Sequence, residues 1–394
     1  MYTQNKNFIF VLVVGTIAIG NAGSTLYLPA LVTIASNLNT SSSMVKLSLA
    51  CYLLTFGLSQ LLYGPMSDAW GRRKILISGL SIFLLGSLIA AFATDIRELL
   101  LGRLIEGAGI GAGNAVGYAL FRDIYSGKEL IRKLSYVSIF VGLTPIIAPL
   151  CGGYLVTFFG WQACFFALSL LAFIVIILQI LQLPETNQNQ NKRAIEPQII
   201  ISNYKTLLVN SDYLSFILVV SVGFAALLSL NAILPFIMIK HLHVTPAHYG
   251  WLTLCTGAGY LSGSYVGGSL AVKSGARVTI KTGSFIQIGI IILALLASLY
   301  AYNIPFVLLP MVIILFSVGF IIPIGSGGAM ALFPEMAGSA AALLGAMMFG
   351  VSSIFTSVVS HLSSDSQKPI FVFLLLLAIL VYLIITFIGN RKNV

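Results

Sequence analysis

The chain has 394 residues, of which 58% are hydrophobic and only 8% are charged. A soluble domain carries about a quarter charged residues, because its surface must be solvated by water. The composition therefore excludes a soluble globular protein and predicts a chain embedded in lipid. The formal net charge is +10, but the basic residues form short clusters between apolar segments. That pattern is typical of membrane proteins and argues against a nucleic-acid-binding protein.

Apolar segments long enough to cross a bilayer recur along the whole sequence. A helix needs about 20 apolar residues to span the hydrocarbon core. Backbone groups cannot stay unpaired in lipid, so spanning segments are helices or a closed barrel, and these runs lack the alternation of barrel strands. An all-α membrane protein with twelve transmembrane helices is predicted. The helices are expected at residues 8–30, 43–66, 75–93, 99–121, 135–157, 162–183, 214–239, 249–271, 279–299, 304–325, 337–360 and 369–389.

One polar stretch divides these segments into six and six. It predicts an N-terminal six-helix bundle over residues 1–183, a cytoplasmic linker over 184–212 and a C-terminal six-helix bundle over 213–394. Membrane transporters are often built from such parallel repeats. Each half has a basic loop between its second and third helices, at residues 64–74 and 273–277, although the second loop is a degenerate copy.

The basic residues are divided unequally between the two sides of the membrane. If the N-terminus is cytoplasmic, only Lys46, Arg97, Lys240 and Lys368 of the 21 lysines and arginines lie on the opposite side, and Arg103 lies within a span. The positive-inside rule then predicts that both termini are cytoplasmic. The first apolar segment is longer than a signal-peptide core and lacks a small-residue cleavage site, so it is expected to remain as the first helix.

The most specific motif follows the second predicted helix. It reads GPMSDAWGRRK, with Gly64, Asp68, Gly71, Arg72 and Arg73 at its defining positions. Glycines permit a tight turn, and an aspartate there can pair with the arginines or with neighbouring helix ends. A basic cytoplasmic loop would explain the arginines but not the aspartate at its fixed offset from both glycines. The motif resembles the loop signature G-x-x-x-D-x-x-G-R-[RK] of the major facilitator superfamily.

Two further segments agree with this resemblance. The fourth predicted helix contains RLIEGAG at residues 103–109, which is similar to the superfamily's R-x-x-Q-G-x-G stretch. The fifth helix resembles the glycine–proline motif of its drug and metabolite antiporters, where such residues allow helices to approach closely and to bend at the hinge between the halves. The residues that carry this second match are Gly142, Pro145, Pro149, Gly152 and Gly153.

Nearly the whole chain resembles one branch of the superfamily, the bicyclomycin-resistance (Bcr/CflA) drug exporters. The strings that carry the resemblance are YLPAL from Tyr27, YGPMSD from Tyr63, RDIY from Arg122, LPET from Leu183 and FPEMAGSA from Phe333. It implies efflux of drugs or small amphipathic metabolites by alternating access, with proton antiport as the energy source. It also implies that Asp123 pairs with the arginines of the Asp68–Arg73 loop and closes the cytoplasmic gate in the outward-facing state.

The chain departs from this branch at the expected proton carrier. Relatives commonly have an aspartate two residues before the tyrosine of the first-helix motif, and Thr25 stands there. Glu106 replaces the usual glutamine of the fourth-helix motif and is the only carboxylate deep inside a predicted span, where ionisable groups are costly and usually functional. Arg103 shares its helix face. Glu106 is therefore either half of a structural ion pair or a relocated proton carrier that Arg103 modulates.

Other polar side chains within the spans are candidates for a substrate cavity. The alternative role for each is an interhelical hydrogen bond, which asparagine commonly forms in membrane bundles. Asn114 and Tyr118 are four residues apart on the fourth helix, and Asn114 lies about three turns from Arg103, so all three can share a face. The candidates are Asn21, Thr25, Tyr27, Asn114, Tyr118 and Asn231.

The sequence contains no P-loop, catalytic triad or zinc-ligand spacing. We therefore expect neither an enzyme nor an ATP-driven pump, and no cofactor or metal. The expected partners are a small-molecule substrate and the lipid bilayer, without nucleic acid or nucleotide, and the chain is expected to be a monomer in a bacterial inner membrane. Two alternatives stay open: a dedicated exporter of one endogenous metabolite, such as a siderophore or an amino acid, and a non-transporting receptor or assembly factor.

Overall fold

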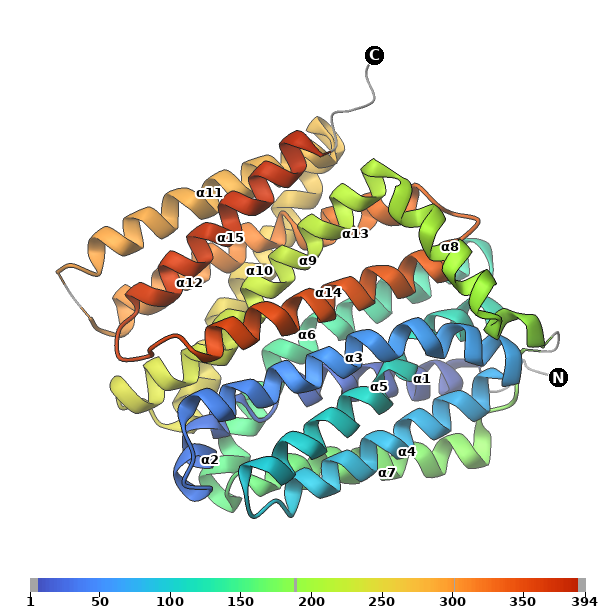
Figure 1. The fold of residues 1–394 in the computed structure, drawn as a ribbon, viewed down its shortest axis with the longest axis horizontal. Helices are drawn as coiled ribbons and strands as arrows, with labels where there is room; N and C mark the ends of the chain where they lie inside the picture. The colour runs from blue at the N-terminus through green and yellow to red at the C-terminus, as the bar shows by residue number, and fades with distance from the viewer. Residues whose placement is uncertain (1–5, 188–189, 301, 389–394) are drawn as a thin grey trace.

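The computed structural model describes residues 6–187, 190–300 and 302–388, and within them every regular element is a helix (Figure 1). Ten helical segments there are long and apolar enough to cross a membrane. Two more long helices, α5 (Ile96–Ile124) and α10 (Pro246–Ser274), contain more polar residues and run beside them. The predicted all-helical membrane architecture is confirmed, because each of the twelve predicted spans overlaps a long helix.

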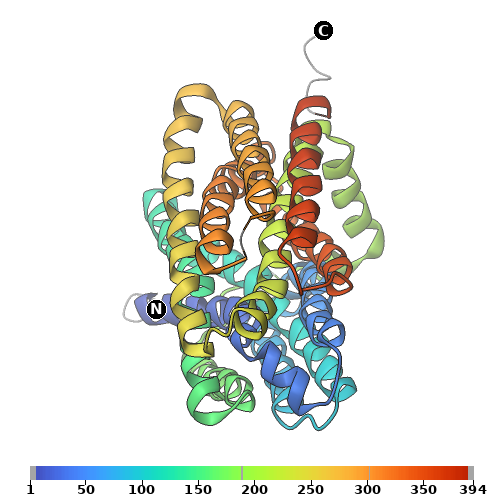
Figure 2. The same cartoon turned by 90° about the vertical axis from the view of Figure 1, so that its left-hand side faces the viewer.

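The helices before and after the linker form the lower and upper parts of the molecule in Figures 1 and 2. The linker contains η2 (Lys192–Ile195) and α8 (Pro197–Val209). The first half consists of α1 (Lys6–Thr25) continued by η1 (Leu28–Ala30) and α2 (Leu31–Asn37), α3 (Ser42–Trp70), α4 (Arg72–Ala91), α5, α6 (Gly127–Phe159) and α7 (Gln162–Gln182). The second half consists of α9 (Ser211–Pro235) continued by η3 (Phe236–His241), α10, α11 (Ala276–Ala297), α12 (Ile304–Gly319) continued by α13 (Ile322–Ala331), α14 (Ala337–Ser360) and α15 (Lys368–Phe387).

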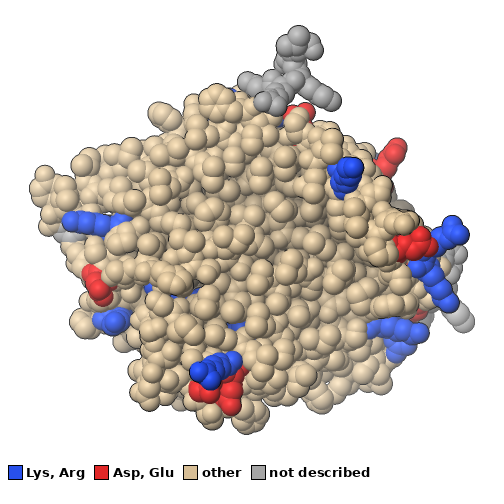
Figure 3. Space-filling view, in the orientation of Figure 1, with Lys and Arg blue, Asp and Glu red and all other residues tan. Residues whose placement is uncertain are grey.

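The molecule has two distinct ends along its helix axes. We call the end that holds residues 64–74 and α8 the linker end, and the opposite end, which holds α2 and the start of α3, the far end (Figure 1). Charged side chains on the face shown in Figure 3 gather mainly toward these ends and leave a broad uncharged band between them. Such a band matches the hydrocarbon layer of a bilayer.

The first helix of each half is interrupted by a proline near the far end. Pro29 lies in the 3-10 turn η1 that follows α1, and Pro235 ends α9 before the π-helical segment η3. A proline has no N–H to donate to the carbonyl four residues earlier, so the regular helix changes geometry there. Both first helices are therefore regular toward the linker end and irregular near the far end.

Glycines on two faces of α5 let this helix lie close to both α3 and α4. A Cβ added to Gly102 or Gly109 would collide with the backbone of α4, and one added to Gly107 would collide with the Tyr52 carbonyl of α3. Small residues at such positions allow helix backbones to approach closely in membranes. This packing places the middle of α5, including Arg103 and Glu106, inside the first half.

The two halves are joined by α3 with α14 and by α6 with α10. In the first pair, the Phe56 and Phe349 rings stack with centroids 4.0 Å apart, and the Ser353 hydroxyl donates to the Ala50 carbonyl at 2.7 Å. In the second pair, a Cβ on Gly153 of α6 would collide with the Pro246 carbonyl of α10. In the arrangement described here, the two halves are therefore in direct contact through both helix pairs.

Toward the linker end the two halves pack less tightly. Among the described residues, no atom of another element lies within 4 Å of a Cβ added to Gly64 of α3 or to Gly142 of α6. Gly142 continues the face of α6 that holds Ile146, whose side chain still contacts Gly257 of α10. The halves therefore pack closely at the far end and centre, whereas at the linker end they flank a cavity, and a Cβ on Gly338 of α14 would still lie 3.3 Å from the Arg122 side chain of α5.

Candidate functional site

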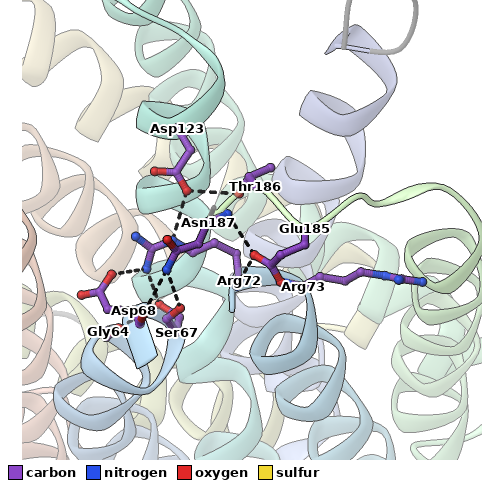
Figure 4. A network of polar contacts seen from close by, with 9 residues as sticks. All are labelled: Gly64, Ser67, Asp68, Arg72, Arg73, Asp123, Glu185, Thr186 and Asn187. Atoms are coloured by element: carbon purple, nitrogen blue, oxygen red, sulfur yellow. Dashed lines mark hydrogen bonds and ion pairs between the residues drawn. The ribbon is translucent and has the colours of Figure 1, made fainter. Parts of the chain in front are cut away.

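Arg72, the first residue of α4, is the centre of a polar network at the linker end (Figure 4). Its Nη1 donates to Asp68 Oδ1 at 2.5 Å and to Ser67 Oγ at 2.6 Å, and its Nε donates to Asp123 Oδ2 at 3.2 Å. Because one guanidinium presents several donors in fixed directions, it can connect the last turns of α3 and α5 to the first turn of α4. The structure thus brings together Asp68, Arg72 and Asp123, as the motif predicted.

All three ion-paired residues of the network belong to the first half. The resemblance implied that their pairing closes the gate in the outward-facing state. The Arg72–Asp123 pair is formed in the arrangement described here, and its role in closing a gate stays a prediction. Arg73 contributes differently from Arg72, because its Nη2 donates to the Ile180 carbonyl of α7 at 2.5 Å.

Glu185, at the start of the linker, caps α4. Its carboxylate oxygens accept from the Arg72 and Arg73 amides at 2.8 and 3.2 Å. A carboxylate at a helix N-terminus satisfies free N–H groups and complements the helix dipole. Gly71 makes this possible, since it has φ +100° and a Cβ there would meet the Glu185 carboxylate. The sequence showed Glu185 as part of the LPET string but gave no role for it.

A cavity of about 330 Å³ lies at the linker end and is lined by residues of both halves and of the linker. The first half contributes Arg72 and Ala119, the second half contributes Glu335 and Ala342, and α8 contributes Tyr204. The Tyr204 hydroxyl donates to the Leu61 carbonyl of α3 at 3.1 Å, which fixes α8 beside the cavity. Burial raises the pKa of Tyr204 to about 12, so this hydroxyl stays a donor at physiological pH.

Arg103 and Glu106 form an ion pair inside the first half, and both side chains are fully buried. The Arg103 guanidinium lies 4.4 Å from the ring centroid of Tyr27 and 4.1 Å from that of Tyr52. A cation placed over aromatic faces is stabilised further when water is excluded. The Arg103 guanidinium is therefore held by the Glu106 carboxylate and by the rings of Tyr27 and Tyr52. In this state both side chains of the ion pair are shielded from water.

The positions of two tyrosines beside Arg103 were not predicted from the sequence. Tyr27, expected in the cavity, is fully buried instead, and its hydroxyl lies 3.1 Å from Ser48 Oγ while its ring covers Arg103. Tyr52 was not predicted at all, although its hydroxyl donates to the Gly20 carbonyl at 2.6 Å and its ring centroid lies 4.1 Å from the Arg103 guanidinium. A tyrosine within an apolar span was the available signal, since its hydroxyl needs a partner there.

The other cavity candidates lie apart from the described cavity. Thr25 is buried and donates to the Asn21 carbonyl at 3.1 Å, and the Asn21 amide donates to Ile17 at 2.9 Å. Asn114 and Tyr118 are half-buried on α5, whereas Ala115 and Ala119 of the same helix line the cavity. Asn231 is half-buried on α9. The cavity at the linker end is therefore lined by different residues.

The glycine–proline residues of α6 lie where that helix meets its neighbours. Pro145 and Pro149 are inside α6, and a Cβ on Gly152 would collide with the Leu26 carbonyl at the end of the first helix. Gly153, one residue on, faces α10 of the other half. The motif thus places one small residue against each half, as a helix at a boundary requires.

A polytopic membrane protein with two helical halves and a cavity between them has the architecture of a membrane transporter. Residues 13–357 match the family model of the Major Facilitator Superfamily, and the chain belongs to that superfamily. The predicted resemblance is confirmed at this level, and the chain is a multi-pass transporter of a small molecule and not an enzyme.

Relatives of known name agree with the drug-exporter branch. Multidrug resistance protein D of Escherichia coli (strain K12) is 29% identical over 388 residues, which cover 96% of this chain and 95% of that protein. The Bicyclomycin resistance protein homolog of Haemophilus influenzae is 27% identical over 380 residues, covering 94% and 93%. The fold is similar to that of the xylose transporter XylE from E. coli, with a TM-score of 0.76, 13% identity and 98% of each chain covered.

Proposed function

We propose that this chain exports drugs or small amphipathic metabolites from the cytoplasm by alternating access. The observation that carries the proposal is the arrangement of the halves, which pack closely at the far end and flank a cavity at the linker end. This is one of the two arrangements that alternation between two halves requires. The basic residues favour a cytoplasmic linker end, so this state would receive substrate from the cytoplasm.

The names of the relatives support the substrate class. One is a multidrug resistance protein and another a bicyclomycin resistance homolog, and both align over nearly the whole chain. The cavity is lined by apolar side chains together with the charged residues Asp68, Arg72, Arg122 and Glu335. A site that mixes apolar surface with a few charges suits an amphipathic molecule.

We also propose that export is coupled to proton antiport, with Glu106 and Arg103 as the coupling pair. The fully buried ion pair favours a structural role in the state described here, because neither side chain can exchange a proton with water. A carrier role requires that the opposite state expose Glu106. The two roles therefore predict different responses to the removal of this carboxylate.

The test is efflux of a cationic dye from proteoliposomes, with and without an imposed pH gradient. We expect gradient-driven efflux in the unchanged protein and its loss in Glu106→Gln, whereas Glu129→Gln, which alters an exposed carboxylate at the start of α6, should leave it unchanged. Full gradient dependence in Glu106→Gln would exclude Glu106 as the carrier. Dye movement indifferent to the gradient would contradict proton antiport, and the absence of any movement would favour a dedicated metabolite exporter.

A further inference from the structure

Lys46, near the start of α3, is a buried cation at the far end of the molecule. Its side chain is only 1% exposed, although it lies close to the end of a spanning helix. A long basic side chain at such a position usually extends toward water. Lys46 instead points into the boundary between the halves, so its burial requires a partner that compensates for the lost hydration.

That partner is the C-terminus of α14, in the other half. Lys46 Nζ donates to the Leu362 carbonyl at 2.9 Å and to the Val359 carbonyl at 3.4 Å. The last carbonyls of a helix have no intrahelical partner and carry the negative end of the helix dipole. The Lys46 ammonium group therefore binds the Leu362 carbonyl just beyond α14 and places its charge beside the Val359 carbonyl, which also accepts from the Leu362 amide at 3.0 Å.

The surroundings of the ammonium group belong mostly to the second half as well. Nζ lies 5.8 Å from the ring centroid of Phe236, and its charged neighbours are Asp365 and Lys240. Asp365 also lies 3.4 Å from His241 Nε2. The first half thus inserts one cation into a site built by the end of η3, the end of α14 and the loop that follows.

Lys46 is the outermost of a row of contacts between α3 and α14. The Ala50–Ser353 hydrogen bond and the Phe56–Phe349 stack follow it toward the centre, and the row ends before Gly64. If the far end opens while the linker end closes, the hydrogen bonds of Lys46 to Leu362 and Val359 must break first. In the opened state water would replace those two carbonyls.

We propose that Lys46 is a positioning residue of the transport cycle, which holds the far end closed by binding the backbone carbonyls of Val359 and Leu362 at and just beyond the end of α14. This inference rests on alternating access, since it assigns Lys46 to one of the two states. It adds a charged connection between the halves at the end opposite the Asp68–Arg72–Asp123 network. The ammonium group acts through α14 and does not contact substrate.

The experiment measures how often the far end opens. Ser353→Cys places a thiol in the closed α3–α14 contact, where residue 353 is 6% exposed. The native cysteines Cys51, Cys151, Cys164 and Cys255 are replaced by alanine, and the purified protein is held in lipid nanodiscs. The rate at which a charged maleimide alkylates residue 353 is then compared between the protein with Lys46 and the variants Lys46→Met and Lys46→Arg. This measurement needs no substrate and does not depend on how the protein is oriented in a membrane.

We expect Lys46→Met to accelerate alkylation about tenfold, because loss of a charged hydrogen bond changes an equilibrium by about that factor. Lys46→Arg, which keeps the charge and the donors, should stay closer to the unchanged protein. The matched control is Lys368→Met, which removes an exposed lysine at the same end.

Three results would each contradict a different step of this proposal. Equal or slower alkylation in Lys46→Met would show that Lys46 does not hold the far end closed. Equal acceleration in Lys368→Met would assign the effect to net charge alone. A thiol at position 353 that never reacts in any variant would contradict opening of the far end, and with it the proposed alternating access.

Discussion

The ion pair between Arg103 and Glu106 gives the sharpest test of how this protein is built. Glu106→Gln keeps the shape of the side chain and an oxygen that can accept from Arg103, but it removes the negative charge. Both side chains are fully buried in the first half. The substitution therefore leaves an arginine cation in the interior without a counter-charge.

The size of the loss follows from what Arg103 retains. Removing one partner of a buried ion pair typically costs about 3–5 kcal/mol. Tyr27 and Tyr52 still cover the guanidinium, with ring centroids 4.4 and 4.1 Å away, and a desolvated cation–π contact contributes about 2 kcal/mol. These ring contacts and the amide oxygen of the introduced glutamine favour a loss of folding stability at the lower limit of that range, about 3 kcal/mol.

The assay compares thermal inactivation in detergent, scored as the fraction that remains monodisperse after heating. Unfolding of such a protein is commonly irreversible, so the order of the midpoints is compared and not converted into free energies. Glu106→Gln should have a clearly lower midpoint than the unchanged protein. The double variant Arg103→Met with Glu106→Leu should recover most of the loss, since replacing both charges by apolar groups is often nearly neutral.

Two outcomes would refute this reasoning in different ways. A Glu106→Gln midpoint equal to that of the unchanged protein would mean that Glu106 is already neutral, which favours the proton-carrier role. A double variant as unstable as Glu106→Gln would mean that the pair is held for its shape and hydrogen bonds and not for charge balance. The same variants serve the efflux assay, so stability and coupling are compared on identical proteins.

Arg72→Met should lower the thermal midpoint and slow transport, because it removes the donors to the Asp68 and Asp123 carboxylates. Arg72→Lys, which keeps the charge but not the fixed donor directions, should lose less than Arg72→Met in both assays and still fall short of the unchanged protein. Gly152→Val should destabilise the protein by about 1–3 kcal/mol through collision with the Leu26 carbonyl. Gly142→Ala should be tolerated, and the yields of monodisperse protein from the two variants are compared. The pKa of Tyr204 is about 12, above its ordinary value of 10.0, so its contribution to stability is complete below about pH 10 and is lost as the pH rises toward 12. Tyr204→Phe should remove that part of the alkaline decline, and an unchanged decline would contradict it.

The helices and the linker-end network could be predicted from the sequence because both depend on local patterns. Apolar runs about as long as the bilayer is thick identify helices without any knowledge of their packing. The fixed offset of Asp68 from Gly64 and Gly71 indicated a structured turn, and the Arg72–Asp123 pair followed from the family resemblance. Predicting these features requires only residues that are close in the sequence, or a motif that is already known.

The interior of the first half and the boundary between the halves could not be predicted in the same way. Tyr27 was expected in a cavity, yet its ring packs on Arg103, because α5 lies closer to the first helix than spacing along one helix can reveal. Lys46 lay inside a predicted span but was counted only as a charge outside the membrane. Its partners, the carbonyls of Val359 and Leu362, are backbone atoms more than 300 residues away, and no side-chain pattern marks them.

The proline breaks in the first helix of each half have a consequence for backbone hydrogen bonding. Pro29 and Pro235 both follow a leucine, and each leaves the carbonyl four residues earlier without its usual helical donor. Those carbonyls belong to Thr25 and Asn231, two of the six residues first singled out for their polar side chains. Each half therefore has, in its first helix, one backbone acceptor that another polar group is able to bind.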